Sequence, residues 1–203
     1  GVLSGTPRDI ADTLRRYLGG MAMRGPMALV LLAGALGLGI LGLVDDYRRL
    51  GPWVKLAAQL AVAALVVVVG GVRVLTVAGA PASIAVSIVW IVVITNSLNF
   101  LDNMDGLAAG ITLICAAVLL AAAGSLGQLF VAAWLCLLIG ACGGFLLFNF
   151  PPAKIFMGDT GSLVLGYFLA VLSMLTTYYH QQADRPMYGV LAPVLVLAVP
   201  LYD

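Results

Sequence analysis

Residues 129–148 read LFVAAWLCLLIGACGGFLLF and contain no charged side chain. About 20 consecutive apolar residues are enough for a helix to cross the hydrocarbon core of a bilayer. A membrane-spanning strand would alternate polar and apolar residues, and this run does not. A helix also satisfies its own backbone hydrogen bonds in lipid. The stretch therefore predicts a transmembrane helix.

The rest of the chain has the same apolar character. Of its 203 residues, 63% are hydrophobic and 9% are charged, and the mean hydropathy is +1.11. Because a soluble domain carries roughly 25% charged residues, these values exclude an ordinary soluble domain, and they also exclude a disordered chain. The net charge is +1 and no run of basic residues occurs. We therefore expect the membrane as a partner and no nucleic acid.

Short polar segments divide the sequence into apolar runs. Besides 129–148, these runs cover residues 27–44, 54–72, 83–101, 107–123, 162–179 and 188–202. They predict an all-α fold, a polytopic transmembrane helix bundle of about seven spans. Residues 1–26 are predicted to form a polar N-terminal segment or extracytoplasmic loop, and residues 27–203 the transmembrane core.

Two further expectations concern a loop and the chain ends. The stretch VRVLTV at 72–77 is rich in β-branched residues and predicts a small hairpin at the membrane surface. The chain begins with Gly1 and ends at Asp203 directly after an apolar run. We therefore expect it to be part of a longer membrane protein.

Alternation of the spans brings three distant polar clusters to one face of the membrane. The loops after the first, third and fifth runs share a side, and these loops carry most of the aspartates. The Lys and Arg counts on the two sides do not decide which face is cytoplasmic, because the N-terminal segment holds four arginines. A site built from several loops is expected on the shared side.

The first cluster is a pair of acids, Asp45 and Asp46, that directly follows an apolar run. Paired carboxylates repel each other and raise each other's pKa. Acids near membrane depth usually mark a functional site, so the pair favours contact with a cation or a substrate. The alternative is a solvated helix end in which Arg48 or Arg49 pairs with the acids.

The second cluster places Asn99, Asp102 and Asp105 at intervals of three residues. On a helix this spacing lines one face. Oxygen ligands of this kind suit a hard cation such as Mg²⁺. The alternative is hydrogen bonding between helices, which asparagines in membranes commonly form. That alternative accounts for the amides better than for the two acids.

The third cluster runs from Asn149 to Ser162, where Pro151 and Pro152 end one helix and GDTGS opens the next. Backbone N–H groups at a helix start bind phosphate well. Asp159 would oppose a phosphate unless a metal lies between them, so the pattern favours a metal–diphosphate. The alternative is an ordinary N-cap, because Asp and Ser both cap helices.

Together the clusters resemble one family, the polyprenyl-phosphate N-acetylhexosamine-1-phosphate transferases. This family includes undecaprenyl-phosphate N-acetylglucosamine-1-phosphate transferases and phospho-N-acetylmuramoyl-pentapeptide transferases. The resemblance covers about residues 27–203, which would be the transferase core, and its three motifs are specific by order and spacing. The matching stretches are LGLVDDYRRLGPWVKLAAQ (41–59), NSLNFLDNMDGLAAG (96–110) and FNFPPAKIFMGDTGS (148–162).

The resemblance implies a reaction. Family members transfer a sugar 1-phosphate from a UDP-N-acetylhexosamine to polyprenyl (undecaprenyl) phosphate, giving a polyprenyl-diphospho-sugar and UMP. The product serves peptidoglycan or other cell-envelope polysaccharide synthesis, such as that of lipopolysaccharide. The resemblance also implies Mg²⁺ as cofactor, with Mn²⁺ as an alternative, and a multi-pass protein of the inner (plasma) membrane whose active site faces the cytoplasm.

The resemblance also implies roles for individual residues. Catalytic roles fall to Asp45, Asp46 and Asp102, substrate binding to Lys55, Asn99, Asn149 and Phe156, and metal binding to Asp105 and Asp159. Because the reaction brings two anions together, we expect Mg²⁺ and Lys55 to neutralise their charge. Asp45 or Asp46 would accept a proton from polyprenyl phosphate or orient it, and the ring of Phe156 would stack on uracil.

Two other functions remain open from sequence. Acids in membrane proteins also mark the path of an ion or solute transporter, although transporter sites usually lie near the bilayer midplane. A catalytically inactive fragment or scaffold of the family is the other alternative. Small-residue stripes such as Gly34, Gly37 and Gly42 pack helices within one chain or between chains, so a homodimer is left open.

Overall fold

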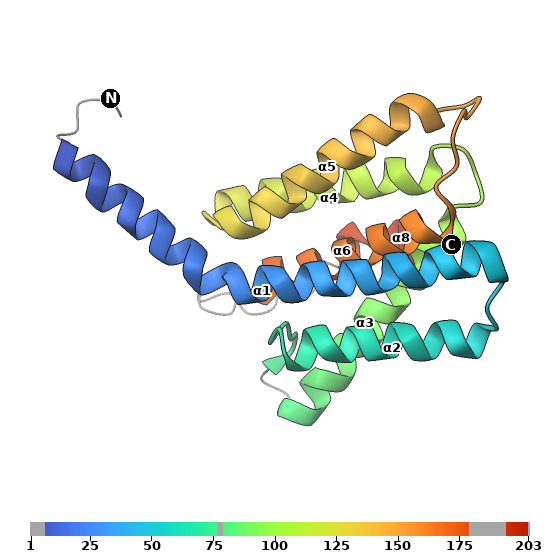
Figure 1. Cartoon of the computed structure of the whole chain (residues 1–203), viewed down its shortest axis with the longest axis horizontal. Coiled ribbons are helices and arrows are strands. Elements are labelled where there is room, and N and C mark those ends of the chain that lie inside the picture. The colour runs from blue at the N-terminus through green and yellow to red at the C-terminus, as the bar shows by residue number, and fades with distance from the viewer. Residues whose placement is uncertain (1–6, 77–78, 179–193, 203) are drawn as a thin grey trace.

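The protein is a bundle of helices in the computed structural model (Figure 1). The structure describes residues 7–76, 79–178 and 194–202, and no strand occurs among them. The helices are α1 (Pro7–Arg48), α2 (Pro52–Val68), α3 (Ala80–Leu101), α4 (Leu107–Ser125), α5 (Leu129–Asn149), α6 (Gly158–Tyr178) and α8 (Ala198–Tyr202). The predicted all-α class is confirmed.

Within the described residues, five helical stretches are long and apolar enough to cross a membrane. They are Arg24–Arg48 within α1, the whole of α3, α4 and α5, and Gly158–Thr176 within α6. Helix α2 is apolar but has only 17 residues. The predicted seventh run, 188–202, lies partly outside the described residues. The part of this run that the structure describes includes α8. The polytopic helical class is therefore confirmed, whereas the number seven is not.

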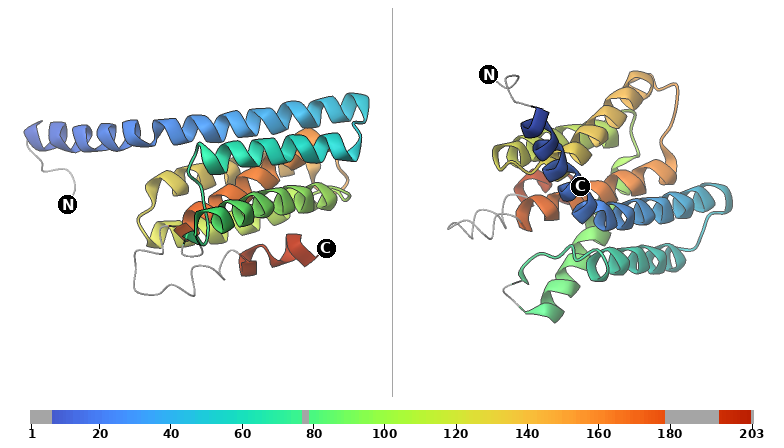
Figure 2. Two further views of the ribbon diagram at one scale, coloured as in Figure 1. Left: turned by 90° about the horizontal axis from the view of Figure 1, so that it is seen from below. Right: turned by 60° about the vertical axis from the view of Figure 1, so that its left-hand side comes forward.

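Helix α1 runs without interruption past the predicted boundary between residues 26 and 27. Pro26 lies inside this helix of 42 residues. The first part of α1 projects beyond the other helices in Figure 1 and in the left view of Figure 2. The division into a segment 1–26 and a core 27–203 stays a prediction.

Helix α6 is the central element of the bundle and packs against α1 and α3. In its most apolar stretch 61% of the residues are buried, against 22–39% in the other four spans. Tyr167, fully buried on α6, donates a hydrogen bond from Oη to the carbonyl oxygen of Leu31 on α1 at 3.1 Å. Gly34 makes this approach feasible, because a Cβ there would lie 2.4 Å from that hydroxyl. The enclosed position of α6 fixes the helix start that carries Asp159.

The predicted hairpin at 72–77 is wrong as far as the structure describes it. Residues 69–76 form a loop without strand pairing. Two serines of α3 bond the backbone of Val74: Ser87 Oγ accepts from its N–H at 2.9 Å, and Ser83 Oγ donates to its carbonyl at 2.6 Å. Because these two side chains satisfy the N–H and the carbonyl of Val74, this residue needs no partner strand.

The polar ends of the spans meet at one end of the bundle. The end of α1, the start of α2, the end of α3, the start of α4, the end of α5 and the start of α6 all lie toward the right of Figure 1. The three sequence clusters lie in these helix ends and the short connections between them. This is the arrangement that alternation of the spans predicts.

Candidate functional site

Lys55 is the centre of a group of polar side chains that we call the polar cluster: Asp45, Asp46, Lys55, Asn99, Asp102 and Asp159. Lys55 Nζ pairs with Asp45 Oδ2 at 3.0 Å and also with Asp159 Oδ2. It further donates to Asn99 Oδ1 at 3.3 Å. The side chain of Lys55 is only 16% exposed. One ammonium group thus joins α1, α2, α3 and α6.

Asn99 uses its whole amide within the polar cluster. Its Nδ2 donates to Asp159 Oδ1 at 2.8 Å and to Ser162 Oγ at 2.8 Å, while its Oδ1 accepts from Lys55. Ser162 Oγ in turn donates to the carbonyl of Gly158 at 3.0 Å. Both oxygens of Asp159 are therefore held at the start of α6.

Asp46 lies at the N-terminus of α6. Its Oδ1 accepts from the N–H of Asp159 at 3.0 Å, and its Oδ2 accepts from the N–H and the hydroxyl of Thr160 at 3.3 and 2.9 Å. Helix N-termini favour negative charge, so the start of α6 is a favourable place for the carboxylate of Asp46. The N–H groups that the sequence predicts to face a phosphate thus face a carboxylate of α1.

Gly42 explains why α1 reaches the start of α6 so closely. It lies one turn before Asp46, and a Cβ on it would be 2.5 Å from the backbone nitrogen of Thr160 and 2.6 Å from the carbonyl of Asp159. Real Cβ atoms do not approach backbone this closely. The backbones of α1 and α6 can therefore meet here only because residue 42 has no side chain.

Asp102 belongs to the polar cluster, but not through the helical stripe that the sequence predicts. Helix α3 ends at Leu101, Asp102 is its C-cap, and a turn follows to Gly106, which has φ +73°. The expectation that Asn99, Asp102 and Asp105 line one helix face is therefore wrong. The pKa of Asp102 is raised to about 6, first by burial and then by the carboxylates of Asp159 and Asp46.

Asp105 and Asn149 form a second arrangement, the loop clamp, which ties the 102–106 turn to the 150–157 loop. Asn149 is 4% exposed; its Oδ1 accepts from the N–H of Gly106 at 2.9 Å, and its Nδ2 donates to the carbonyl of Ile155 at 2.8 Å. Asp105 Oδ2 accepts from the N–H of Ala153 at 3.0 Å. Direct substrate binding by Asn149 stays a prediction, and its present contacts are to backbone.

Phe156 lies on the loop that the clamp holds. The residue is 79% exposed, although it follows an apolar helix and precedes the buried α6. A large apolar side chain exposed on a fixed loop is a suitable surface for stacking. The structure thus leaves the ring free for the role that the family resemblance implies.

The polar cluster has a donor set that fits a hard cation only in combination with a ligand. Asp45, Asp46, Asp102 and Asp159 against Lys55 leave a formal charge of −3. Oxygen donors and excess negative charge suit Mg²⁺, which usually keeps waters or phosphate oxygens among its ligands. Within the described ranges, however, no three His, Cys, Asp or Glu side chains are grouped to hold a metal by themselves.

The two predicted metal ligands lie in different arrangements. Asp159 is in the polar cluster, whereas the Asp105 carboxylate is exposed and bonds the N–H of Ala153. The hypothesis that these two residues share one Mg²⁺ stays a prediction. Instead, Asp46 accepts a hydrogen bond from the backbone N–H of Asp159. Asp102 lies near both carboxylates, because their charges add to burial in raising its pKa.

Four polar residues with contacts in or beside the cluster were not predicted as site residues from sequence. Thr160 bonds Asp46 and Ser162 bonds Asn99, and both belong to the GDTGS stretch that opens α6. Gln59 and Asn96 bond each other one turn away from Lys55 and Asn99. Asn96 forms the hydrogen bond between helices that the sequence offers as the alternative for its amides.

The fold and the site define a class of protein: a multi-pass helical membrane protein that gathers aspartates around a lysine at one end of its bundle. Comparison with known families gives the particular assignment. Residues 28–177 match Glycosyl transferase family 4, and the chain belongs to this family.

Individual relatives agree with this assignment. A probable undecaprenyl-phosphate N-acetylglucosaminyl 1-phosphate transferase of Bacillus subtilis is 35% identical over 97% of this chain and 60% of its own length. A phospho-N-acetylmuramoyl-pentapeptide-transferase of Heliobacterium modesticaldum is 39% identical over 74% of this chain and 53% of its own length. A decaprenyl-phosphate N-acetylglucosaminephosphotransferase of Mycobacterium tuberculosis is 36% identical over 96% of this chain and 54% of its own length. The chain thus spans between half and two thirds of these relatives.

Proposed function

We propose that this chain carries the reaction centre of a polyprenyl-phosphate N-acetylhexosamine-1-phosphate transferase. The observation that carries the proposal is the polar cluster, in which Lys55 lies between Asp45 and Asp159 beside the start of α6. The relatives' names, which specify transfer of a sugar phosphate to a polyprenyl phosphate, supply the reaction class. UDP-N-acetylhexosamine as donor belongs to the same proposal.

In the proposed reaction one phosphate attacks another. An oxygen of polyprenyl phosphate forms a bond to the sugar-bearing phosphorus of the UDP-sugar, and the bond from that phosphorus to UMP breaks. UMP leaves with the bridging oxygen. Mg²⁺, or Mn²⁺ in its place, would supply positive charge to the diphosphate when bound, with Asp159 as its protein ligand and Asp102 of the polar cluster as the second.

The residues of the chain have separable tasks in this reaction. Lys55 would bind the phosphate of the lipid and offset its charge. Asp46 is committed to the N-terminus of α6 and would hold Asp159 in place. Asp102 is then the carboxylate suited to take a proton, because its raised pKa, about 6, lies near the second pKa of a phosphate monoester. Asp45 is paired with Lys55 and would orient the phosphate. Because that phosphate is largely ionised at neutral pH, positioning would contribute more than base catalysis.

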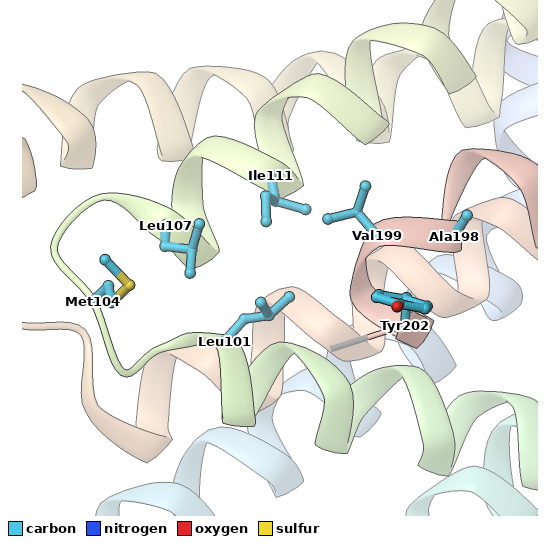
Figure 3. A pocket seen from close by; sticks show the side chains of 7 residues that line it. All are labelled: Leu101, Met104, Leu107, Ile111, Ala198, Val199 and Tyr202. Carbon is cyan, nitrogen blue, oxygen red and sulfur yellow. The ribbon is translucent and has the colours of Figure 1, made fainter.

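An apolar pocket next to the polar cluster supports a lipid substrate. It has a volume of about 650 Å³ and lies between the end of α3, the start of α4 and α8 (Figure 3). Its lining is almost wholly apolar and includes Leu101 and Met104, which flank Asp102 in the chain. We propose that the first isoprene units of the polyprenyl chain enter here, so that the phosphate faces Asp102.

The sugar and the membrane side follow from the same proposal. Two relatives that match nearly the whole chain carry N-acetylglucosamine in their names, which favours UDP-N-acetylglucosamine over UDP-N-acetylmuramoyl-pentapeptide.

We propose that the polar end of the bundle faces the cytoplasm from the plasma (inner) membrane, and that the product enters cell-envelope polysaccharide synthesis. A homodimer stays a prediction. The transporter alternative has no support, since the carboxylates lie at helix ends.

The test is Mg²⁺-dependent release of UMP by membranes that contain this chain and, separately, a longer protein that includes it. Undecaprenyl phosphate is supplied with one of the two UDP-sugars. Turnover with UDP-N-acetylglucosamine is expected and would establish the transferase. Turnover by the longer protein alone would mean that segments outside this chain complete the site. Silence from both, with folded protein in the membrane, would favour the scaffold alternative.

A further inference from the structure

Two amides form a polar contact inside the apolar part of the bundle. Gln59 of α2 donates from Nε2 to Asn96 Oδ1 at 3.2 Å, and Asn96 of α3 donates from Nδ2 to Gln59 Oε1 at 2.7 Å. Asn96 Nδ2 also donates to the carbonyl of Val92 at 2.8 Å, and Gln59 is only 2% exposed. Each amide thus finds its partner on the other helix.

This pair lies directly beneath the contact between Lys55 and Asn99. Lys55 and Gln59 are four residues apart on α2, and Asn96 and Asn99 are three apart on α3, so each pair shares a helix face. Lys55 Nζ and Asn99 Oδ1 are 3.3 Å apart. Helices α2 and α3 are therefore joined at two levels. The neutral amides of Gln59 and Asn96 join them in the apolar part of the bundle, and Lys55 and Asn99 join them in the polar cluster.

The amide pair specifies the rotation of α2 more strictly than its apolar neighbours do. Ala63, Val66 and Val67 supply the rest of the buried face of α2, and such contacts tolerate small shifts. The helix begins at Pro52, and its N-cap, Gly51, makes no side-chain capping bond. A shift of one residue would turn the helix by about 100°. It would leave the buried Gln59 amide and Asn96 Oδ1 without each other as partners.

We propose that Gln59 and Asn96 are positioning residues, whose reciprocal amide bonds set the register of α2 against α3 and so keep Lys55 between Asp45 and Asp159. A single buried polar residue has this role in coiled coils, where it fixes the register of helices. Only the effect on turnover rests on the proposed transferase function. The effect on Lys55 itself needs no substrate.

The first test measures how fast Lys55 is modified by an amine-reactive reagent in membranes, followed by mass spectrometry. The chain has two lysines, so exposed Lys154 provides an internal reference in every molecule. Gln59→Leu and Asn96→Leu are each expected to raise the ratio of Lys55 to Lys154 labelling about five-fold. The exchanged pair, Gln59→Asn with Asn96→Gln, is expected to bring the ratio back within two-fold of the wild-type value.

Two further variants separate positioning from general loosening. Thr112→Val removes an equally buried polar group of α4, whose hydroxyl donates to Ala108 of its own helix, and should leave the labelling ratio unchanged. The double variant Gln59→Leu with Asn96→Leu should regain thermal stability, since no amide is left unpaired, and yet keep the raised ratio. An unchanged ratio in either single variant, or an equal rise with Thr112→Val, would overturn the proposal.

Turnover gives the second readout. In both single variants kcat for UMP release is expected to fall about ten-fold and to recover in the exchanged pair. If neither this chain nor the longer protein that includes it releases UMP, the proposed transferase function fails, while the labelling ratio still decides the positioning role. If the labelling ratio rises and turnover of an active wild type is unaffected by the single variants, the link between the amide pair and the reaction is wrong.

Discussion

The polar cluster around Lys55 and the loop clamp around Asn149 lie at the same end of the bundle but use their polar groups differently. In the cluster, polar side chains from four helices contact each other, and Lys55 pairs with the carboxylates of Asp45 and Asp159. In the clamp, side chains bond backbone groups of two loops and leave the ring of Phe156 exposed. Charge is concentrated where phosphates would react, and rigidity is provided where a base would stack.

The largest effect is expected from loss of the central charge. Lys55→Gln should lower the rate of UMP release by about 100-fold or more, because removal of one positioned electrostatic group commonly costs 10²–10³ in rate. Lys154→Gln is the matched variant: it removes an exposed lysine on the clamped loop and should change the rate by less than five-fold. Equal losses in the two variants would contradict the distinction between the regions.

A methyl group at Gly42 should break the cluster without removing any of its polar atoms. Gly42→Ala is expected to lower turnover by about 10- to 100-fold, because a Cβ 2.5 Å from the nitrogen of Thr160 must push the start of α6 away from Asp46. Gly39→Ala is the control on the same helix, since its Cβ would meet Val164 at an ordinary 3.5 Å. Similar turnover in both variants would exclude the close approach of α1 and α6 as a requirement.

The exposed ring of the clamped loop tests the second region. Phe156→Ala should raise the KM for the UDP-sugar by about ten-fold with kcat changed less than three-fold, since base stacking is worth about 1–3 kcal/mol. Phe156→Tyr should behave like the wild type. A fall in kcat without a change in KM would assign the ring to the reaction step and remove the contrast with the polar cluster.

The smallest expected effect concerns stability and pH. The pKa of Asp102 is raised from 3.8 to about 6 in the folded protein, so the native state holds more protons than the unfolded state between these values. The free energy of unfolding therefore falls as pH rises through this range. Without added Mg²⁺, Asp102→Asn should raise Tm by about 2–4 °C at pH 8 and not at pH 4. An equal difference at both pH values would contradict repulsion as the cause.

Much of the fold follows from the sequence because lipid imposes a simple rule on it. Uninterrupted apolar runs must be helices in a bilayer, and the predicted run 129–148 differs from α5 by one residue. The hairpin prediction failed because β-branched residues in VRVLTV indicate a preference only. The serines that hold Val74 lie on α3, outside that stretch.

The sequence predicted several of the residues that gather around Lys55, but not how they are arranged. Spacing and the family resemblance selected the residues around Lys55, and alternation of the spans put them on one side. The sequence could not show that α3 ends at Leu101, which separates Asp105 from Asp102. Nor could it show that Asp46 occupies the start of α6, since that contact depends on the missing side chain at Gly42 and links residues 113 positions apart.

The most direct test of the central claim is a Mg²⁺ titration of UMP release in Asp159→Asn and Asp105→Asn, each beside the wild type. The claim is that the metal-dependent step belongs to the polar cluster. Asp159→Asn is expected to lose Mg²⁺-dependent turnover, whereas Asp105→Asn should keep the wild-type Mg²⁺ requirement and raise the KM for the UDP-sugar. Full Mg²⁺-dependent turnover in Asp159→Asn, or the same loss in both variants, would contradict the account.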